Sequence, residues 1–283
     1  MANIINGKLI ANQVKNNVKL EVDKLKESGI EVCLAVVLVG NDPASKVYVR
    51  NKKLACDKVG IISKEILFDE NISQNELVSA IKDLNNDNKI NGILVQLPLP
   101  RHLDEKEIIR SIDPVKDVDA FHPVNVGKIM IGEYDFLPCT PAGIVDLIDS
   151  TGVDICGKNC VVVGRSNIVG KPMAMLLTNR SGTVTVCHSK TNKLIEFTKK
   201  ADILVAAVGV ANFINADMIK PGAVVIDVGI NRMQDGKLCG DVDFASAEKV
   251  AGYITPVPGG VGPMTIAKLM ENTLRAAKKQ NSI

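Results

Sequence analysis

The sequence predicts an α/β protein built from two α/β domains, the second containing a parallel sheet, with a cleft between the domains. Three observations support this prediction. Short apolar runs alternate with amphipathic stretches along all 283 residues, which is the pattern of parallel strands covered by helices. Hydrophobic residues make up 46% and charged residues 23% of the chain, as in globular proteins. The runs also form two series, separated by a stretch with Pro and Gly at 132–143.

The first series of elements belongs to the expected N-terminal domain. Its apolar runs have the length and composition of buried strands, and the stretches between them carry apolar residues at helical spacing. Ser73 and Glu76 form an S-x-x-E capping box at the start of one such stretch. We therefore expect strands at 32–40, 64–68 and 92–97, and helices at 9–27, 43–59 and 73–86.

The second series shows the same alternation of strand and helix. We expect strands at 159–164, 183–187, 202–209 and 223–229, and helices at 170–179 and 191–200. A last helical segment at 264–279 follows the turn-rich sequence PVPGGVGP. The expected domains are therefore residues 1–140 and 141–263, with the C-terminal segment 264–283 packing back on the first domain.

Charge and cysteine usage exclude several classes of protein. Lys plus Arg number 34 and Asp plus Glu 32, a net charge of +2, so neither nucleic acid nor a membrane surface is an expected partner. No apolar segment has the character of a signal peptide or the length of a membrane span. Seven cysteines without a CxxC pair argue against a disulfide framework and a zinc site. We expect a cytoplasmic protein with reduced thiols and no bound metal.

The segment VVVGRSNIVGKP at 161–172 carries the sharpest local signal. A buried strand ends at Gly164, a tight turn follows, and a helix begins near Val169. Free backbone N–H groups and the helix dipole at such a turn bind a pyrophosphate. The pattern departs from G-x-G-x-x-G, because Ser166 replaces the second glycine and the third is displaced to Gly170. Its place at the first strand of a parallel series nevertheless predicts a Rossmann-type dinucleotide-binding domain.

The end of the next strand indicates which dinucleotide binds. NAD sites usually place a carboxylate about 20 residues after the glycine turn to hold the ribose 2′-OH. Here the strand at 183–187 is followed by His188, Ser189 and Lys190. Arg165 and Ser189 offer a charge and a hydroxyl that suit a 2′-phosphate, so we expect NADP. Alternatively, Arg165 is an exposed loop residue and Ser189 is the N-cap of the next helix.

Four features supply residues that can carry chemistry. Tyr48 and Lys52 lie one helical turn apart, so they share a face that can transfer protons, unless it is simply a solvated face. Gln96 is a polar residue at an apolar strand end, where ligand sites of parallel sheets form. DPVKDVDAFHP at 113–123 gathers three carboxylates, as a heterocycle site or as a solvated turn. PVPGGVGP at 256–263 provides a rigid, closely approachable backbone.

These features occur in order with several others along essentially the whole chain: YVRNK, VQLPLP, KDVDAFHP, PCTPAG, GRSNIVGKP, HS, IDVGIN, GDVDF and TPVPGGVGPMT. In this combination the sequence resembles the methylenetetrahydrofolate dehydrogenase/methenyltetrahydrofolate cyclohydrolase family. The resemblance implies NADP-dependent oxidation of 5,10-methylenetetrahydrofolate to the 5,10-methenyl form, and hydrolysis of that product to 10-formyltetrahydrofolate. It also implies a role in one-carbon metabolism and purine biosynthesis, and a homodimer built on the nucleotide-binding domain.

The resemblance also implies roles for individual residues. Lys52 would be the general acid/base that activates water on the methenyl carbon, Tyr48 would orient the folate, and Gln96 would keep Lys52 in a productive protonation state. Asp119 would grip the pterin ring, with Asp117 nearby. The implied cofactor-binding residues are Gly164, Arg165, Ser166, Ser189 and Ile230. The implied folate-binding residues are Tyr48, Lys52, Val95, Gln96, Leu97, Asp119, Pro258, Gly259, Gly260, Val261 and Gly262.

Two residues depart from the family pattern. Ala120 stands where glycine is common, and we expect it to be tolerated unless the position needs a positive φ. Leu54 stands where a basic residue is common, which removes a charge that can bind a polyglutamylated folate tail. Three alternatives remain: another two-domain NADP-dependent dehydrogenase of a small metabolite, a non-catalytic relative that binds the cofactor, and an enzyme that retains only one of the two activities.

Overall fold

The chain forms two compact units in the computed structural model, which describes residues 1–233 and 235–283. Unit 1 comprises Met1–Asn12 and Thr140–Thr265, and unit 2 comprises Gln13–Cys139 and Ile266–Ile283. The boundaries between the units fall within helices α1 (Gly7–Glu27) and α10 (Val261–Gln280) and at the start of α6 (Cys139–Asp149).

The N-terminal residues belong to unit 1, which differs from the expected division at residue 140. Strand β1 (Asn3–Ile4) pairs in parallel with β11 (Tyr253–Ile254) near the other end of the chain. The backbone N–H of Ile5 also donates to the carbonyl of Ile254 at 2.9 Å. These bonds attach residues 1–12 to the second half of the sequence.

Unit 2 contains a parallel sheet of three strands in the order β3-β2-β4. The strands are β2 (Cys33–Val39), β3 (Ile62–Phe68) and β4 (Gly92–Val95). All of β2 is buried, because it pairs with β3 on one side and β4 on the other. The register aligns Val37 with Val95 and places the carboxyl ends of these two strands at the same edge.

The helices of unit 2 cover this sheet. They are α2 (Pro43–Val59), α3 (Gln74–Asn86), α4 (Glu105–Ser111) and α5 (Pro123–Ile131), together with parts of α1 and α10. The capping box of α3 is confirmed, since the Ser73 side chain accepts from the N–H of Glu76 and the Glu76 side chain accepts from the N–H of Ser73. The apolar face of α3 packs on the sheet and forms the core of the unit.

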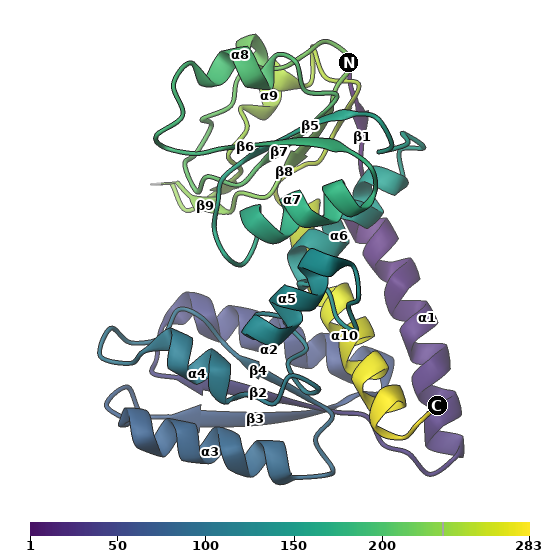
Figure 1. Cartoon of the computed structure of the whole chain (residues 1–283), viewed down its shortest axis with the longest axis vertical. Helices are drawn as coiled ribbons and strands as arrows, with labels where there is room; N and C mark the ends of the chain where they lie inside the picture. The colour runs from purple at the N-terminus through teal and green to yellow at the C-terminus, as the bar shows by residue number, and fades with distance from the viewer. Residues whose placement is uncertain (234) are drawn as a thin grey trace. The chain divides into compact units, whose positions relative to one another are not determined.

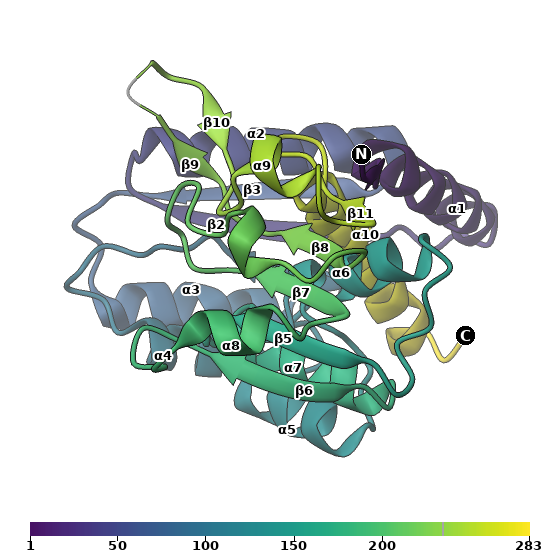
Figure 2. The same ribbon diagram turned by 90° about the horizontal axis from the view of Figure 1, so that it is seen from above.

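Unit 1 contains a parallel sheet of six strands in the order β1-β11-β8-β7-β5-β6, seen from above in Figure 2. The strands expected from the second series are present as β5 (Asn159–Val163), β6 (Thr183–Cys187), β7 (Ile203–Ala206) and β8 (Val224–Asp227). The chain passes from β5 to β6 on one side and then to β7 on the other. The strand order therefore reverses at β5, and such a switch point is where open parallel sheets bind dinucleotides.

Helices lie on both faces of this sheet. Figure 1 shows α8 (Leu194–Thr198) and α9 (Phe244–Ala247) on one face, and α6 and α7 (Gly170–Asn179) on the other. The core beneath α8 and α9 is built from the side chains of alternate strand residues such as Val161, Val163, Leu204 and Val225. A short helix, η1 (Ala216–Met218), and a hairpin of β9 (Asn231–Arg232) and β10 (Leu238–Cys239) complete the unit.

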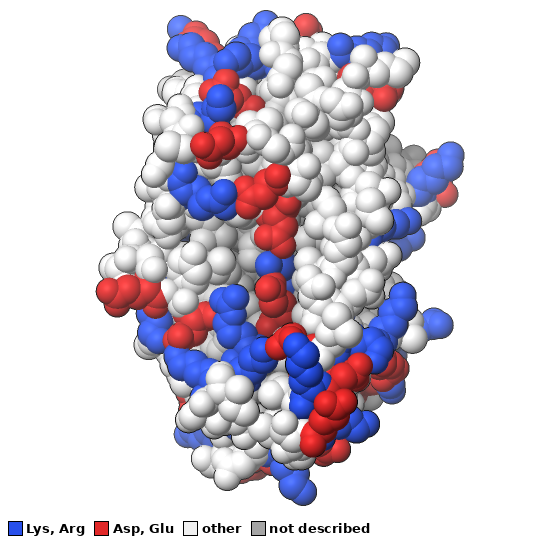
Figure 3. Space-filling view, turned by 90° about the vertical axis from the view of Figure 1, so that its right-hand side faces the viewer, with Lys and Arg blue, Asp and Glu red and all other residues white. Residues whose placement is uncertain are grey.

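The surface carries charges of both signs. On the face shown in Figure 3, Lys and Arg side chains are interspersed with Asp and Glu side chains, in keeping with the net charge of +2. Mixed charges of this kind largely cancel at a distance. Among residues 1–233 and 235–283, no helix combines the length and the apolar character that crossing a bilayer requires.

Candidate active site

Helix α2 places Tyr48 and Lys52 on one face, because they lie four residues apart. The helix begins after Asp42, whose carboxylate accepts a 2.7 Å hydrogen bond from the N–H of Ser45. The Tyr48 side chain remains 40% exposed and accessible to a ligand. Lys52 is partly buried, and its Nζ donates a 2.9 Å hydrogen bond to Oε1 of Gln96. Lys52 therefore does not extend freely into solvent.

The end of strand β4 fixes the orientation of Gln96. Its backbone N–H donates to the carbonyl of Val37 at 2.9 Å, which continues the pairing of β4 with β2 by one residue. Its side-chain Nε2 donates to the carbonyl of Leu97 at 2.6 Å. Since the amide nitrogen is engaged there, the amide oxygen is the atom that faces Lys52.

Burial and charge act in opposite directions on Lys52 and Asp119. Loss of hydration lowers the pKa of Lys52, whereas the charge of Asp119 raises it. Burial raises the pKa of Asp119, and the charge of Lys52 lowers it. Because burial is the larger cause for both groups, the site favours their neutral forms more than water does. The lowered pKa makes Lys52 a better proton acceptor than a lysine in water.

Two residues beside Asp119 have no role in the sequence-based predictions. The buried thiol of Cys139 lies beside Asp119 and donates to the carbonyl of Val118 at 3.5 Å, and burial raises the pKa of Cys139 well above its usual value. Asn272 of α10 donates from Nδ2 to the carbonyls of Val118 and Leu137, both at 2.8 Å. Cys139 occurs in the PCTPAG motif, so the sequence offered a way to find it. No local pattern marks Asn272, which lies 154 residues from Val118 in the sequence.

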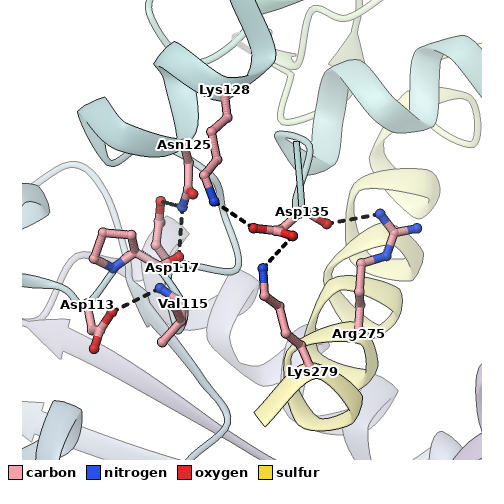
Figure 4. Close-up of polar contacts among 9 residues, drawn as sticks. Asp113, Val115, Asp117, Asn125, Lys128, Asp135, Arg275 and Lys279 are labelled. Carbon is pink, nitrogen blue, oxygen red and sulfur yellow. Dashed lines mark hydrogen bonds and ion pairs between the residues drawn. The ribbon is translucent and has the colours of Figure 1, made fainter. Parts of the chain in front are cut away.

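The loop from 113 to 123 is an ordered turn around Asp117. Figure 4 shows the Asp117 carboxylate accepting a hydrogen bond from Asn125 Nδ2, and its Oδ2 also accepts from the N–H of His122 at 2.8 Å. Burial raises the pKa of Asp117. Nearby in the same unit, Asp135 pairs with both Lys128 and Lys279. A pocket in this unit is lined by Ile93, Leu94, Val95, Leu97, Ile109, Ile112, Asp117, Asp119 and Phe121.

Ala120 has a positive φ, the backbone conformation in which an alanine is expected to be poorly tolerated. Its φ is +56°, in the left-handed region that glycine occupies without strain. The residue is also fully buried, between Asp119 and Phe121. The alanine is therefore accommodated in a strained position next to a proposed substrate-binding residue.

In unit 1, the turn after β5 is packed too closely for side chains at its glycines. A Cβ on Gly164, whose φ is +132°, would lie 2.1 Å from the carbonyl oxygen of Ala207. A Cβ on Gly170 would lie 2.2 Å from the carbonyl oxygen of Gly164. Ser166 occupies the position of the second glycine, and its Oγ accepts from the N–H groups of Val169 and Gly170 at 3.1 and 3.3 Å. The close-packed turn between strand and helix that the sequence predicts is thus present, and Ser166 holds two of the N–H groups at the start of the helix.

The other predicted cofactor-binding residues follow three strands of the same sheet. Arg165 follows β5 and Ser189 follows β6, and both residues are exposed. The alternative role of Ser189 as a helix N-cap is wrong, because the N-cap of α8 is Lys193. Ile230 follows β8 and is 48% exposed.

The PVPGGVGP segment joins β11 to α10 and packs on the start of α1. A Cβ on Gly7 would lie 1.9 Å from the carbonyl oxygen of Gly260, so the two backbones are in direct contact. Pro258 is exposed, and the predicted wall residues Gly259 and Gly262 are partly exposed, whereas Gly260 and Val261 are buried. A Cβ on Gly262 would lie 3.9 Å from Cδ1 of Ile230. The segment therefore adjoins one of the proposed cofactor-binding residues.

The cysteines are free thiols, and five of the seven are buried. Within the described ranges 1–233 and 235–283, no cluster of three or more His, Cys, Asp or Glu side chains is arranged to hold a metal ion.

Family models match both parts of the chain. The model of the tetrahydrofolate dehydrogenase/cyclohydrolase catalytic domain matches residues 5–119. The model of the NAD(P)-binding domain of the same family matches residues 138–281. The first match contains Tyr48, Lys52, Gln96 and Asp119, and the second contains the glycine turn at Gly164.

Two relatives are similar over nearly their full length. The bifunctional protein FolD of Acetivibrio thermocellus is 62% identical over 279 residues, which cover 99% of this chain and 98% of that protein. The bifunctional protein FolD of Bacillus subtilis is 57% identical over 278 residues, which cover 98% of each chain.

Solved structures show the same fold. The crystal structure of the bifunctional methylenetetrahydrofolate dehydrogenase/cyclohydrolase FolD from Campylobacter jejuni has a TM-score of 0.97 and 50% identity, and covers 99% of each chain. The methylenetetrahydrofolate dehydrogenase-cyclohydrolase of Trypanosoma brucei, complexed with NADP and an inhibitor, has a TM-score of 0.95 and 38% identity. That match covers 100% of this chain and 99% of the other.

Proposed function

We propose which residues of this chain carry out each step of its reactions. The chain belongs to the tetrahydrofolate dehydrogenase/cyclohydrolase family. The enzyme oxidises 5,10-methylenetetrahydrofolate to the 5,10-methenyl form with NADP and hydrolyses that product to 10-formyltetrahydrofolate. In the proposal, residues around Lys52 in unit 2 handle the folate and the water, and the strand ends of unit 1 hold the cofactor. When bound, NADP supplies the hydride acceptor.

The dehydrogenase step needs positioning more than proton transfer. The carbon that loses hydride lies between two nitrogens, which stabilise the cation that forms. Asp119 binds the pterin ring and Tyr48 orients the folate, so that the reacting carbon is held in place. Val95 and Leu97 contribute apolar contacts at the pocket that Asp119 also lines.

The cyclohydrolase step needs a proton acceptor, and Lys52 fills this role in the proposal. Water forms a C–O bond to the methenyl carbon and gives up a proton to Nζ of Lys52. The proton then passes to the ring nitrogen whose bond to that carbon breaks, while the new hydroxyl becomes the formyl C=O and releases its own proton to solvent. The observation that supports this role best is the 2.9 Å hydrogen bond that joins Lys52 to Gln96, at a site where burial lowers the pKa of the lysine.

The cofactor site of the proposal is built on the switch point of unit 1. The turn from Gly164 to Gly170 lies between a strand and the start of a helix, and its two glycines have no room for a Cβ, which fits the tight backbone of a dinucleotide site. Arg165 and Ser189 bind the 2′-phosphate, Ser166 supports the turn, and Ile230 contacts the cofactor. The folate-side wall runs from Pro258 to Gly262.

We also propose a cellular setting for the enzyme. The enzyme acts in the cytoplasm as a homodimer built on unit 1, without nucleic acid or membrane partners, and its 10-formyl product serves purine biosynthesis. The family resemblance supports the dimer, and the near-balanced charge of +2 supports the absence of polyanionic partners. Sedimentation equilibrium tests the dimer, since it distinguishes a mass of 30.4 kDa from twice that value.

Two separate assays on purified protein test the assignment of Lys52. NADP reduction with 5,10-methylenetetrahydrofolate reports the dehydrogenase, with an acid quench to measure the methenyl product, and decay of added methenyltetrahydrofolate reports the cyclohydrolase. We expect Lys52→Ala to lower the cyclohydrolase rate by about 10²- to 10⁴-fold, the usual contribution of a general base, and to affect the dehydrogenase much less.

Lys53→Ala is the matched control. Lys53 is the next residue of α2, is 54% exposed, and pairs with Glu65 at 2.8 Å. We expect both activities of this variant to match the wild type. Equal loss of both activities in Lys52→Ala, or an unchanged cyclohydrolase rate, would contradict the proposed role of Lys52.

A further inference from the structure

Two aspartates of unit 1 are buried, and their carboxylates accept hydrogen bonds from backbone N–H groups and one asparagine amide. Asp227 ends strand β8 and is 3% exposed, and Asp241, in the segment after the β9–β10 hairpin, is fully buried. Both belong to sequence motifs, IDVGIN and GDVDF, in which the family resemblance implies a role for Ile230 but none for the aspartates. Burying a carboxylate is costly unless several hydrogen-bond donors surround it, so the arrangement of those donors indicates its purpose.

Asp241 joins the segment after β7 to the segment after β8. Its Oδ2 accepts from two consecutive backbone N–H groups, those of Val208 at 2.6 Å and Gly209 at 2.9 Å. Its Oδ1 accepts from Nδ2 of Asn231 at 2.9 Å. One carboxylate thus fixes a backbone turn and a side chain that come from different strand ends.

Asp227 in turn holds Asp241 in place. Its Oδ1 accepts from the N–H groups of Asp241 at 2.8 Å and Gly229 at 3.0 Å, and its Oδ2 accepts from Val242 at 2.9 Å. The backbone closes tightly around both carboxylates. A Cβ on Gly240 would lie 1.8 Å from Oδ2 of Asp227, and a Cβ on Gly229 would lie 2.3 Å from Oδ1 of Asp241.

The segments that Asp241 fixes lie at the carboxyl ends of β7, which is next to β5, and of β8, which is next to β7. Ala207, which contacts the turn at Gly164, immediately precedes Val208, and Ile230 immediately precedes Asn231. Ligands of open parallel sheets bind at this edge, beside the switch point. The donors of Asp241 are therefore next to residues that the proposed function assigns to the cofactor.

We infer that Asp241 is a positioning residue for the cofactor site: its carboxylate sets the backbone at Val208 and Gly209 and, through Asn231, the position of Ile230. The inference rests on the proposed cofactor site. A carboxylate suits this role better than an amide, because it accepts from all three donors at once. An asparagine has one acceptor oxygen, and its NH₂ group would face a donor.

Calorimetric titration of the folate-free protein with NADP tests the inference in wild type, Asp241→Asn and Asp243→Asn. Asp243 lies in the same segment, and its side chain makes no capping hydrogen bond to α9. We expect Asp241→Asn to raise the Kd and the KM for NADP about tenfold, the effect of disrupting one charge-assisted hydrogen bond, with a smaller change in kcat. The backbone amides of Val208 and Gly209 should also exchange hydrogen faster in the free protein. Asp243→Asn should bind as the wild type does.

The cyclohydrolase serves as the internal control. It needs no hydride acceptor, so a residue that shapes only the cofactor site leaves it within about twofold of wild type. Proportional loss of both activities, or an NADP Kd within twofold of wild type, would overturn the inference. If the wild type itself failed to bind NADP, the proposed cofactor site would be wrong instead.

Asn231→Ala provides a second variant if Asp241→Asn does not fold. Asn231 is only partly exposed, and its loss removes one donor from Asp241 without creating a buried unpaired backbone group. We expect about a threefold rise in the NADP Kd, with the cyclohydrolase rate unchanged. An unchanged Kd in this variant would also overturn the inference.

Discussion

Lys52 donates a 2.9 Å hydrogen bond from Nζ to Oε1 of Gln96, which joins helix α2 to the end of strand β4. The oxygen points at the lysine because the Gln96 nitrogen donates to the carbonyl of Leu97. The acceptor is uncharged, so it orients the amine without the large stabilisation of the ammonium form that a carboxylate would give. Gln96 is therefore suited to hold a lysine that works as a proton acceptor.

Substitution of Gln96 by glutamate tests this relationship. A carboxylate at this position would raise the pKa of Lys52 and keep it protonated near neutral pH. We expect Gln96→Glu to lower the cyclohydrolase rate at pH 7 by about 10- to 100-fold and to move the rising limb of its pH–rate profile to higher pH. The measurement is the decay of methenyltetrahydrofolate across a pH series, extrapolated to zero buffer.

Gln13→Glu is the control for added charge. Gln13 is exposed on α1, so its replacement adds the same charge to the same unit away from the Lys52–Gln96 hydrogen bond. Its pH profile should match the wild type. A Gln96→Glu profile that also matched the wild type would show that Gln96 does not control the protonation of Lys52.

Gly164→Ala should impair the dehydrogenase and leave the cyclohydrolase active, the reverse of the effect expected for Lys52→Ala. The added Cβ would lie 2.1 Å from the carbonyl oxygen of Ala207 and force the turn after β5 to move. We expect NADP binding to weaken by at least about 100-fold, because the phosphate cradle depends on the backbone of this turn. The cyclohydrolase rate, measured on added methenyltetrahydrofolate, should change little.

Gly157→Ala distinguishes the clash from backbone strain alone. Gly157 also has a positive φ, +72°, but a Cβ there would have no neighbour within 4 Å. This variant should lose some thermal stability and keep its NADP affinity. Similar losses of NADP affinity in the two variants would mean that unit 1 responds to general destabilisation rather than to the shape of the turn.

Arg165→Ala tests the choice between NADP and NAD. Arg165 follows β5 and is exposed, and an arginine binds a phosphate through two hydrogen bonds that a ribose hydroxyl cannot replace. We expect the KM for NADP to rise about 10- to 100-fold and the KM for NAD to stay nearly constant. Arg180→Ala, which removes a surface arginine paired with Asp149, should change neither value. Equal increases for both cofactors would refute the assignment of Arg165 to the 2′-phosphate.

The regular elements and the nucleotide turn could be predicted from the sequence because their signals are local. The apolar runs of β2, β5 and β8 and the Ser73 capping box depend on residues within a few positions of one another. The pairing of β1 with β11 could not be predicted, since two-residue strands have no periodic pattern and these lie at opposite ends of the chain. The same applies to Asn272, whose contact with Val118 spans 154 residues.

Unusual backbone conformations and buried polar networks also could not be predicted from the sequence. The positive φ of Ala120 could not be predicted, because alanine rarely adopts it and the surrounding loop imposes it. The aspartates of IDVGIN and GDVDF were visible in the sequence, but their role depends on which distant N–H groups face them. Asp227, for example, accepts from Val242, 15 residues further along the chain.

The stability of the protein should carry a pH dependence due to Asp227. Burial raises the pKa of Asp227 from 3.8 to about 6, with a further contribution from the charge of Asp241, against the effect of the N–H groups that it accepts from. Between these two values the folded protein binds more protons than the unfolded chain, so the free energy of unfolding falls as the pH rises. The expected loss is about 2 kcal/mol from pH 4 to pH 7, most of the roughly 3 kcal/mol that the shift is worth at about 1.4 kcal/mol per pKa unit.

Asp227→Asn removes this titration and should flatten that part of the stability curve. Carboxylates whose pKa is lowered, such as Asp202, have the opposite pH dependence but titrate in both proteins, so they cancel in the difference. The measurement is calorimetric Tm from pH 4.5 to 7.5, with Asp217→Asn, an exposed aspartate of η1, as the control. We expect the wild-type Tm to fall relative to Asp227→Asn as the pH rises towards 7, while Asp217→Asn runs parallel to wild type. Parallel curves for wild type and Asp227→Asn would mean that Asp227 is ionised throughout this range and that its N–H donors outweigh its burial.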